Sequence, residues 1–407
     1  MKQHKYLPWL KVKPPVGLAL AGLLMLSLIS SAWASGNKTG WTRFAITGDH
    51  RCLATAAAVN ANKTGYLEGG VNTKVLKDLA IALRNEEVEF VLDVGDLVAK
   101  FDGKLLTGNL PDGTKITADR LIADELGLFT TTWNTWAGEL PIYPIRGNHE
   151  QSASAATYLA GIAALPGIGD MLPNTTSPSE SDQGLTYAFA VKNCVFVALD
   201  VYMNPSIIPT IRADTLDWMS ELLADSAQRH VFVWAHTPAY EVWDSENLAK
   251  SPPVWSSRDG LASPKGSTGP VNCLAAADVR DPFWNILGDV KGSYFCGHDH
   301  TYLRGWAPAA NGYPVMQTII GNGGAPPYPP YPADPYVESD ITVGNCGSPR
   351  PSMAFFDQSG SLGQDSYGYV LIEIHGAHAT ATYKAEDRIG GTFSVRDQWS
   401  WKIIGND

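Results

Sequence analysis

The strongest constraint on the fold of this chain is a repeated order of apolar strand, short polar turn and amphipathic helix that begins near Trp41. The segment RFAITGDH predicts a strand up to Thr47, and Leu76, Leu79 and Leu83 follow at helical spacing. Further strands are predicted by VEFVLDVGD, LPIYPIRGNHE, HVFVWAHTP, GSYFCGHDH and YPVMQTIIGNGG. Some of these are apolar throughout, as is a strand buried on both faces. The alternation predicts an α/β fold with a largely parallel sheet covered by helices, and TYAFAVKNCVFVALD predicts an added hairpin.

The first 34 residues have the pattern of a secretory signal peptide. Four lysines form a basic head, Val16 to Ile29 is apolar, and Ala32-Trp33-Ala34 offers a cleavage site. The apolar run is shorter than the ~20 residues that a membrane-spanning helix needs, although an uncleaved membrane anchor is the alternative. We therefore expect export to the periplasm or the cell exterior, with residues 35–407 as the mature domain and no membrane attachment after cleavage.

Charge and cysteine content narrow the possible partners and sites. Without the four lysines of the leader, 26 Lys and Arg face 41 Asp and Glu, a net charge of −15. Such a surface repels nucleic acid and anionic membranes, so neither is an expected partner. Of the five cysteines, Cys194 and Cys296 lie in apolar strand-like segments and are expected in the core, whereas Cys273 and Cys346 are the better candidates for a disulfide. Nothing in the sequence sets the oligomeric state.

Asp, Asn and His residues follow five of the predicted strands. In an open parallel sheet, ligands gather at the carboxyl ends of the strands. Five of the eight histidines in residues 35–407 lie at these ends, and His298 and His300 have the spacing that points alternate side chains to one face. Oxygen and imidazole ligands without thiolates suit Zn, Fe or Mn, and two such ions suit displacement at phosphorus. The strand-end residues are Asp49, His50, Asp96, Asn148, His149, Glu150, His236, His298 and His300.

Five ordered motifs resemble the signature of the calcineurin-like metallophosphoesterases. They are GD at Gly48, GDLV at Gly95, GNHE at Gly147, AHTP at Ala235 and GHDH at Gly297. The intervening YAFAVKNCVFVALD, LDWMSELLA and IIGNGGAP resemble the branch of that family that includes the purple acid phosphatases. The resemblance covers nearly all of the mature chain. It implies a four-layer α/β/β/α sandwich of two mixed sheets flanked by helices, with a dinuclear metal site.

The resemblance also assigns roles by motif position. An activated water would attack phosphorus, and His149 would protonate the leaving oxygen or stabilise the transition state, oriented by Glu150. The two ions would be divalent or of mixed valence, and the sequence does not decide among Fe, Zn and Mn. One ion would be held by Asp49, Asp96 and His300, and the other by Asp96, Asn148, His236 and His298.

The chain departs from the family pattern at Arg51. The first motif of the family is Asp-x-His, but here Arg51 stands where the histidine belongs, and a guanidinium does not bind metal. Purple acid phosphatases place a tyrosine in the second motif, where this chain has Ala99. Three explanations remain: water completes the shell, His50 reaches the ion, or the first site is weak and the enzyme partly uses a single metal. Arg51 and Arg304 are candidates to bind substrate phosphate, and the alternatives are a surface arginine in a turn for Arg51 and a structural ion pair for Arg304.

We interpret the sequence as an exported metal-dependent phosphoesterase for small-molecule phosphate esters, with monoesters favoured. The alternatives are a phosphodiesterase of the same fold, and a non-catalytic metal- or phosphate-binding protein with a degraded first metal site. Segments 99–116, 242–280 and 326–365 lack clear periodicity. They are expected to be loop insertions that shape the choice of substrate.

Overall fold

The computed structural model describes eleven stretches of the chain, which hold all the elements named below. Within them, no helix is long and apolar enough to cross a membrane. The predicted signal peptide lies outside the described residues. The stretches are 41–52, 70–99, 117–171, 174–203, 209–224, 226, 229–240, 273–325, 352–357, 366–386 and 389–403.

One mixed sheet joins the N-terminal strands of the chain to its C-terminal strands. Its order is β13-β12-β11-β1-β2-β3. β1, β2 and β3 run parallel, whereas β11 pairs antiparallel with β1 and begins an antiparallel meander. The strands are β1 (Trp41–Thr47), β2 (Phe90–Asp93), β3 (Ile142–Pro144), β11 (Tyr367–His375), β12 (His378–Glu386) and β13 (Ser394–Lys402).

The second mixed sheet is built from the middle of the chain. Its order is β10-β8-β9-β7-β6-β5-β4, with β5, β6, β7 and β9 parallel. The predicted hairpin is confirmed, since β4 and β5 pair antiparallel around Lys192 and Asn193. The strands are β4 (Tyr187–Val191), β5 (Cys194–Leu199), β6 (His230–Ala235), β7 (Ser293–Cys296), β8 (Tyr302–Pro308), β9 (Pro314–Ile320) and β10 (Ser352–Phe356).

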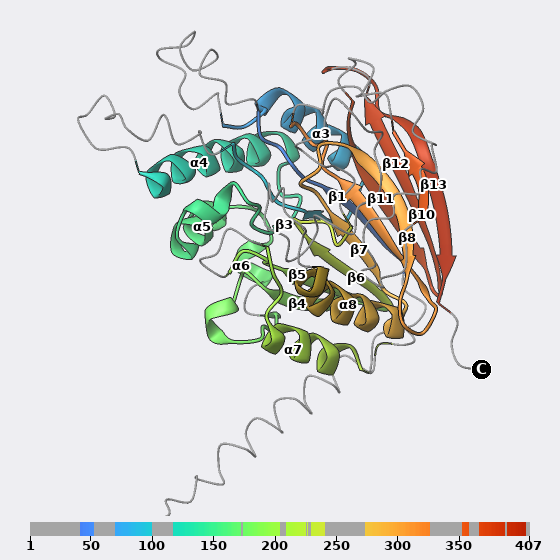
Figure 1. Cartoon of the computed structure of the whole chain (residues 1–407). Helices are drawn as coiled ribbons and strands as arrows, with labels where there is room; N and C mark the ends of the chain where they lie inside the picture. Colours follow the sequence, from blue (N-terminus) through green and yellow to red (C-terminus); the bar gives the residue numbers. More distant parts are fainter. Residues whose placement is uncertain are drawn as a thin grey trace, which may run out of the picture.

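Helices cover the outer faces of both sheets, which gives the predicted α/β/β/α layers. Figure 1 shows α3 and α4 on one side of the paired sheets and α7 and α8 on the other. In α3, the predicted leucines form the buried stripe. The helices are α3 (Thr73–Asn85), α4 (Ala118–Ala137), α5 (Ala155–Ile162), α6 (Ile168–Met171), α7 (Ala213–Leu223) and α8 (Cys273–Val290), with short 3-10 turns η2 (Glu150–Ser152) and η4 (Glu180–Asp182).

An aromatic layer holds the two sheets face to face. Phe44 of β1 lies edge-on to Phe196 of β5 and Phe232 of β6, with ring centroids 5.1 and 5.0 Å apart. Phe90 of β2 meets Phe196 in the same way at 5.3 Å. Edge-to-face pairs of this kind add to the free energy gained by burial. The rigid contact between the sheets fixes the ends of their parallel strands relative to one another.

Two of the predicted insertions contain regular structure. The last part of segment 242–280 belongs to α8, which begins at Cys273, and segment 326–365 contains β10. Both were expected to be loops. The Ala- and Leu-rich start of α8 and the apolar run of β10 supply the missed signals. Cys194 and Cys296 are buried in the core, as predicted, while Cys346 and most of segment 99–116 lie outside the described residues.

Candidate active site

The candidate site lies where parallel strands of both sheets end. Asp49, Asp96 and His298 each follow such a strand, and each has a left-handed backbone, with φ of 59°, 53° and 74°. Non-glycine residues adopt this conformation rarely, and such strain gathers at functional sites. Hydrogen bonds between the turns hold it: Asp49 N donates to Gly95 O, and His298 N donates to Asp49 Oδ2, at 2.8 and 2.9 Å. The backbone thus aims side chains of both sheets at one volume.

Four donor atoms from four turns converge there, and we call them the four-donor site. They are Asp96 Oδ1, Asn148 Oδ1, His236 Nε2 and His298 Nδ1. His236 Nε2 lies 3.3 Å from Asp96 Oδ1, 3.1 Å from Asn148 Oδ1 and 3.3 Å from His298 Nδ1. Asn148 Oδ1 lies 2.9 Å from His298 Nδ1. This is the complete second ligand set implied by the motifs.

The chemistry of the four-donor site calls for a cation at its centre. His236 Nδ1 is 2.8 Å from the carbonyl oxygen of Val94, which can only accept, so Nδ1 carries the proton. In the neutral ring Nε2 is then a lone pair, and it faces the Asp96 and Asn148 oxygens. Only a proton or a metal ion reconciles these groups. Although burial would lower the pKa of His236, Asp96 and Asp49 raise it to about 9, so a proton can also meet this need.

Asp49 and Asp96 share this buried region and differ in electrostatics. Burial raises the pKa of Asp49 well above its usual value, against the charges of His236 and Arg51. Burial would do the same to Asp96, but His149, His236 and Arg51 hold its pKa well below the usual range. Ligand atoms of Asp49, Asp96 and His236 all lie within 4.8 Å of one another. These residues therefore fit a divalent ion. Such an ion would neutralise the buried carboxylate charge in place of protons.

Arg51 enters the same region from the first motif. Its Nη2 lies 2.7 Å from His300 Nε2, and its Nε lies 3.5 Å from Asp96 Oδ2. His300 Nε2 in turn lies 3.8 Å from Asp49 Oδ1. The residues assigned to the first ion are thus brought together, but with a guanidinium among them. A first-site ion does not fit this arrangement.

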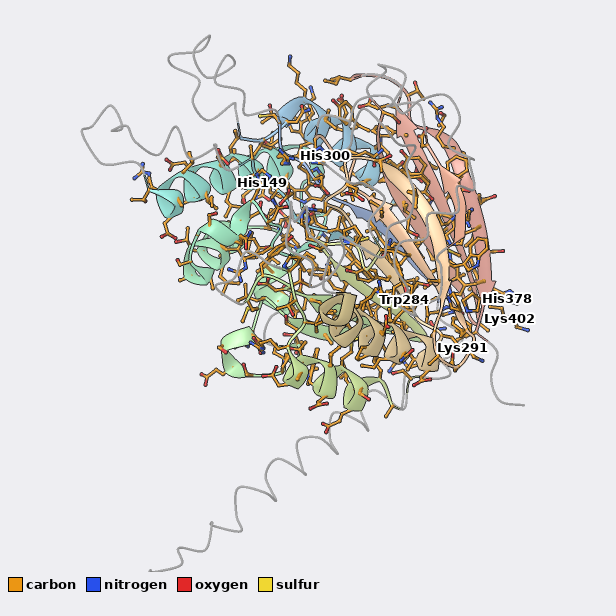
Figure 2. The ribbon with its side chains drawn as sticks, in the orientation of Figure 1. His149, Trp284, Lys291, His300, His378 and Lys402 are labelled. Atoms are coloured by element: carbon orange, nitrogen blue, oxygen red, sulfur yellow. The ribbon has the colours of Figure 1, made fainter. Side chains whose placement is uncertain are left out.

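His149 borders the site through Asp96 and is partly exposed to solvent. Figure 2 shows His149 and His300 at one end of the sheets, far from His378 and Lys402 at the other. His149 Nε2 is 3.6 Å from Asp96 Oδ2, and Nδ1 donates to the Ala99 carbonyl. Burial lowers its pKa to about 4. Because Nδ1 is engaged by the backbone, Nε2 is the ring atom that faces the site.

The predicted contact between Glu150 and His149 is wrong. Glu150 is buried, and its two oxygens accept hydrogen bonds from Val98 N at 3.0 Å and Gly147 N at 2.7 Å. Burial and the charge of Asp96 raise its pKa to about 8. Glu150 therefore ties the GDLV turn to the GNHE turn and acts as a positioning residue. A carboxylate within three residues of a turn N–H commonly does this, which the sequence reasoning overlooked.

His50 does not complete a metal shell. Its Nδ1 is 2.9 Å from Gly323 O and its Nε2 is 2.7 Å from Asp93 Oδ2, and all of it is buried. One of the three explanations for the missing ligand is thereby removed. Asp93 is the residue that sequence reasoning missed: it ends β2 beside the assigned Asp96, and its Oδ1 also accepts from Gly95 N at 2.9 Å. The segment VLDVGD contains two aspartates, and the sequence reasoning assigned a role to Asp96 alone.

Arg304 does not serve the site as predicted. Its Nε and Nη2 bind the two carboxylate oxygens of Asp397 at 2.8 and 3.0 Å, and its guanidinium lies over the ring of Trp399. This bidentate pair joins β8 to β13. Arg304 is therefore a structural ion-pair partner that links the two sheets.

The sequence profile of the Calcineurin-like phosphoesterase family matches residues 42–302. That stretch is more than half of the chain and carries every residue of the four-donor site. The chain belongs to the calcineurin-like phosphoesterases. Membership of this family accounts for the cluster of side chains that could hold a metal ion.

Solved structures share the fold of this phosphoesterase at low sequence identity. The purple acid phosphatase PPD1 from yellow lupin (Lupinus luteus) seeds is 14% identical, with a TM-score of 0.52 over 89% of this chain and 54% of that one. This phosphoesterase therefore spans about half the length of the lupin enzyme. The protein PhoD is 13% identical, with a TM-score of 0.53 over 90% of this chain and 70% of that one. No curated protein sequence matches significantly.

Proposed function

We propose that this protein is an exported, metal-dependent phosphatase that hydrolyses small-molecule phosphate monoesters. The observation that carries the metal dependence is the four-donor site, where His236 Nε2 lies 3.3 Å from Asp96 Oδ1 and 3.1 Å from Asn148 Oδ1. A divalent ion bound there would polarise the phosphoester and lower the pKa of a water. Zn, Fe and Mn all suit this donor set.

The side chains around the four-donor site have separate parts in this reaction. Asn148, His149 and His298 are half-buried, so a phosphate group can reach them from solvent. His149 Nε2 is the ring nitrogen that faces this volume, because the Ala99 carbonyl fixes Nδ1, and it would donate to a phosphate oxygen or the leaving oxygen when the ring carries both protons. Arg51 adds a positive charge beside the same volume.

The preference for monoesters rests on the shared fold with the lupin purple acid phosphatase. Hydrolysis of p-nitrophenyl phosphate and of bis-p-nitrophenyl phosphate by the metal-loaded protein tests it directly. We expect the monoester to give the higher kcat/KM. A higher value for the bis ester would assign a phosphodiesterase, and metal binding without turnover of either ester would assign a binding protein.

His298→Ala tests whether the four-donor site is the catalytic centre. Loss of one ligand should lower kcat/KM by at least about 100-fold, because it removes charge stabilisation worth several kcal/mol. His378→Ala is the matched control, since His378 is exposed at the start of β12, far from the site. Activity that persists both in His298→Ala and after chelation of the wild type would refute the proposal.

Export is proposed from the leader pattern alone. We expect the mature protein in the periplasmic or external fraction, with Ser35 as its first residue. N-terminal sequencing of the fractionated protein checks this. Met1 retained on a membrane-bound form would instead support the uncleaved anchor.

A further inference from the structure

The guanidinium of Arg51 lies where the family pattern expects a metal ion. Arg51 Nη2 is 2.7 Å from His300 Nε2, and Arg51 Nε is 3.5 Å from Asp96 Oδ2. His300 and Asp96 are two of the three residues assigned to the first ion. The third, Asp49, places Oδ1 3.8 Å from His300 Nε2. The cationic group is thus surrounded by would-be metal ligands, within contact distance of two of them.

The contact with His300 excludes metal binding by the same atom. A guanidinium nitrogen can only donate, so His300 Nε2 must accept with its lone pair. That lone pair is the one a metal ion would use. A guanidinium also keeps its charge at any pH at which a protein folds. An ion at contact distance from His300 would therefore meet a fixed positive charge as well as a missing ligand.

The carboxylates support the same conclusion. Asp49 and Asp96 are both buried, and Asp49 Oδ1 has no hydrogen-bond partner within the described part of the chain. Two buried carboxylates in one region need a proton or a cation nearby. The four-donor site can supply one ion, and the charge of Arg51 acts on both carboxylates.

We propose that Arg51 replaces one of the two metal ions of the family, so that this phosphoesterase binds a single divalent ion, in the four-donor site. In catalysis, which rests on the proposed function, the arginine would offset negative charge on a phosphate oxygen, as a second ion does elsewhere. Its side chain is 19% exposed, so part of it can reach a bound phosphate. One of the two positive groups beside the substrate would then be a side chain of the protein, which does not depend on metal supply.

Metal stoichiometry tests this without reference to turnover. Wild type, Arg51→His and Arg51→Ala are loaded with Mn²⁺, freed of excess metal, and measured for metal content and by electron paramagnetic resonance. Arg51→His places an imidazole at the position of the family ligand. Arg51→Ala removes the guanidinium from His300 Nε2 and so tests the exclusion even if the new imidazole fails to reach the ion. Arg120→His is the matched control, because Arg120 is an exposed residue of α4 paired with Asp124.

We expect about one Mn²⁺ per chain in wild type and Arg120→His, with the six-line spectrum of an isolated ion. Arg51→His should bind about two ions, with the spectrum of a coupled pair, and Arg51→Ala should gain a weaker second site. Two ions in wild type overturn the proposal. One ion in all four proteins also overturns it, since the arginine would then not be what excludes the second.

The stoichiometry and the proposed function fail separately. One ion in wild type and two in Arg51→His, with no turnover of any phosphate ester, would refute the phosphatase and leave the replacement standing. Rapid turnover by a wild type that holds two coupled ions would refute the replacement and leave the phosphatase standing.

Discussion

The pair of His50 and Asp93 shows how one buried contact can set the position of a ligand that it does not touch. Gly323 O and Asp93 Oδ2 are both acceptors, so His50 satisfies them together when both of its ring nitrogens carry protons. Asp93 also accepts from Gly95 N, one residue before Asp96. The pair therefore holds the turn that presents Asp96 to the metal.

Asp93→Ala should lower the free energy of unfolding by about 3 kcal/mol, because it leaves a buried polar ring and a backbone N–H without their partner. Metal affinity should fall roughly 10- to 100-fold, as for other residues that orient ligands. Urea unfolding and Mn²⁺ titration measure the two effects.

Asp93→Asn is the control for that substitution. An asparagine can accept from Gly95 N with its oxygen and donate to a neutral His50 with its nitrogen, so both contacts survive. Stability and metal affinity should stay near those of wild type. Equal losses in the alanine and asparagine variants would show that the charge of Asp93, and not its hydrogen bonds, holds the turn.

At the scale of elements, the turns after the strands are packed so closely that glycine is required where one turn meets a carboxylate of another. A Cβ on Gly297, after β7, would lie 2.1 Å from Asp49 Oδ2, and one on Gly147 would lie 2.1 Å from Asp96 Oδ1. Neither carboxylate is at the end of a long flexible chain. The glycines of GHDH and GNHE thus leave space for metal-binding carboxylates from neighbouring turns.

Gly297→Ala should displace Asp49 and, through the bond from His298 N to Asp49 Oδ2, the ligand His298. We expect kcat/KM to fall roughly 10- to 100-fold and stability by about 1 to 3 kcal/mol. Gly127→Ala in α4 is the control, because a Cβ there meets nothing within 4 Å. It should keep full activity and add up to about 1 kcal/mol of stability. Unchanged kinetics in Gly297→Ala would contradict the role given to this turn.

Elements were the scale at which the sequence was most informative. The parallel strands and their polar ends follow from periodicity, and ligands from distant segments meet because such ends share one edge of a sheet. Side-chain direction within the turns did not follow, since the left-handed backbone at Asp49 breaks the alternation that a strand would continue. His50 was one of three explanations for the missing ligand, and Glu150 and Arg304 were assigned to the site by proximity in sequence, but the side chains of all three bind other partners.

At the scale of the whole molecule, the four-donor site spans the interface between the two sheets. Asp96 and Asn148 follow strands of the first sheet, whereas His236 and His298 follow strands of the second. The aromatic layer that includes Phe44 holds the sheets together along their length. A bound ion would join them again at the end where these turns meet.

Removing the ion should therefore destabilise the entire fold and not only the site. A ligand that binds only the folded state at 100 times its Kd adds about 2.7 kcal/mol to the free energy of unfolding, which corresponds to roughly 3 to 4 °C in Tm for a chain of this size. We expect chelation to lower the Tm of wild type by this amount, as followed by circular dichroism. His236→Ala, which removes the ligand contributed by β6, should show a lower Tm that chelation no longer changes. A wild-type Tm that stays constant while metal content falls to zero would mean that the sheets hold together without the ion.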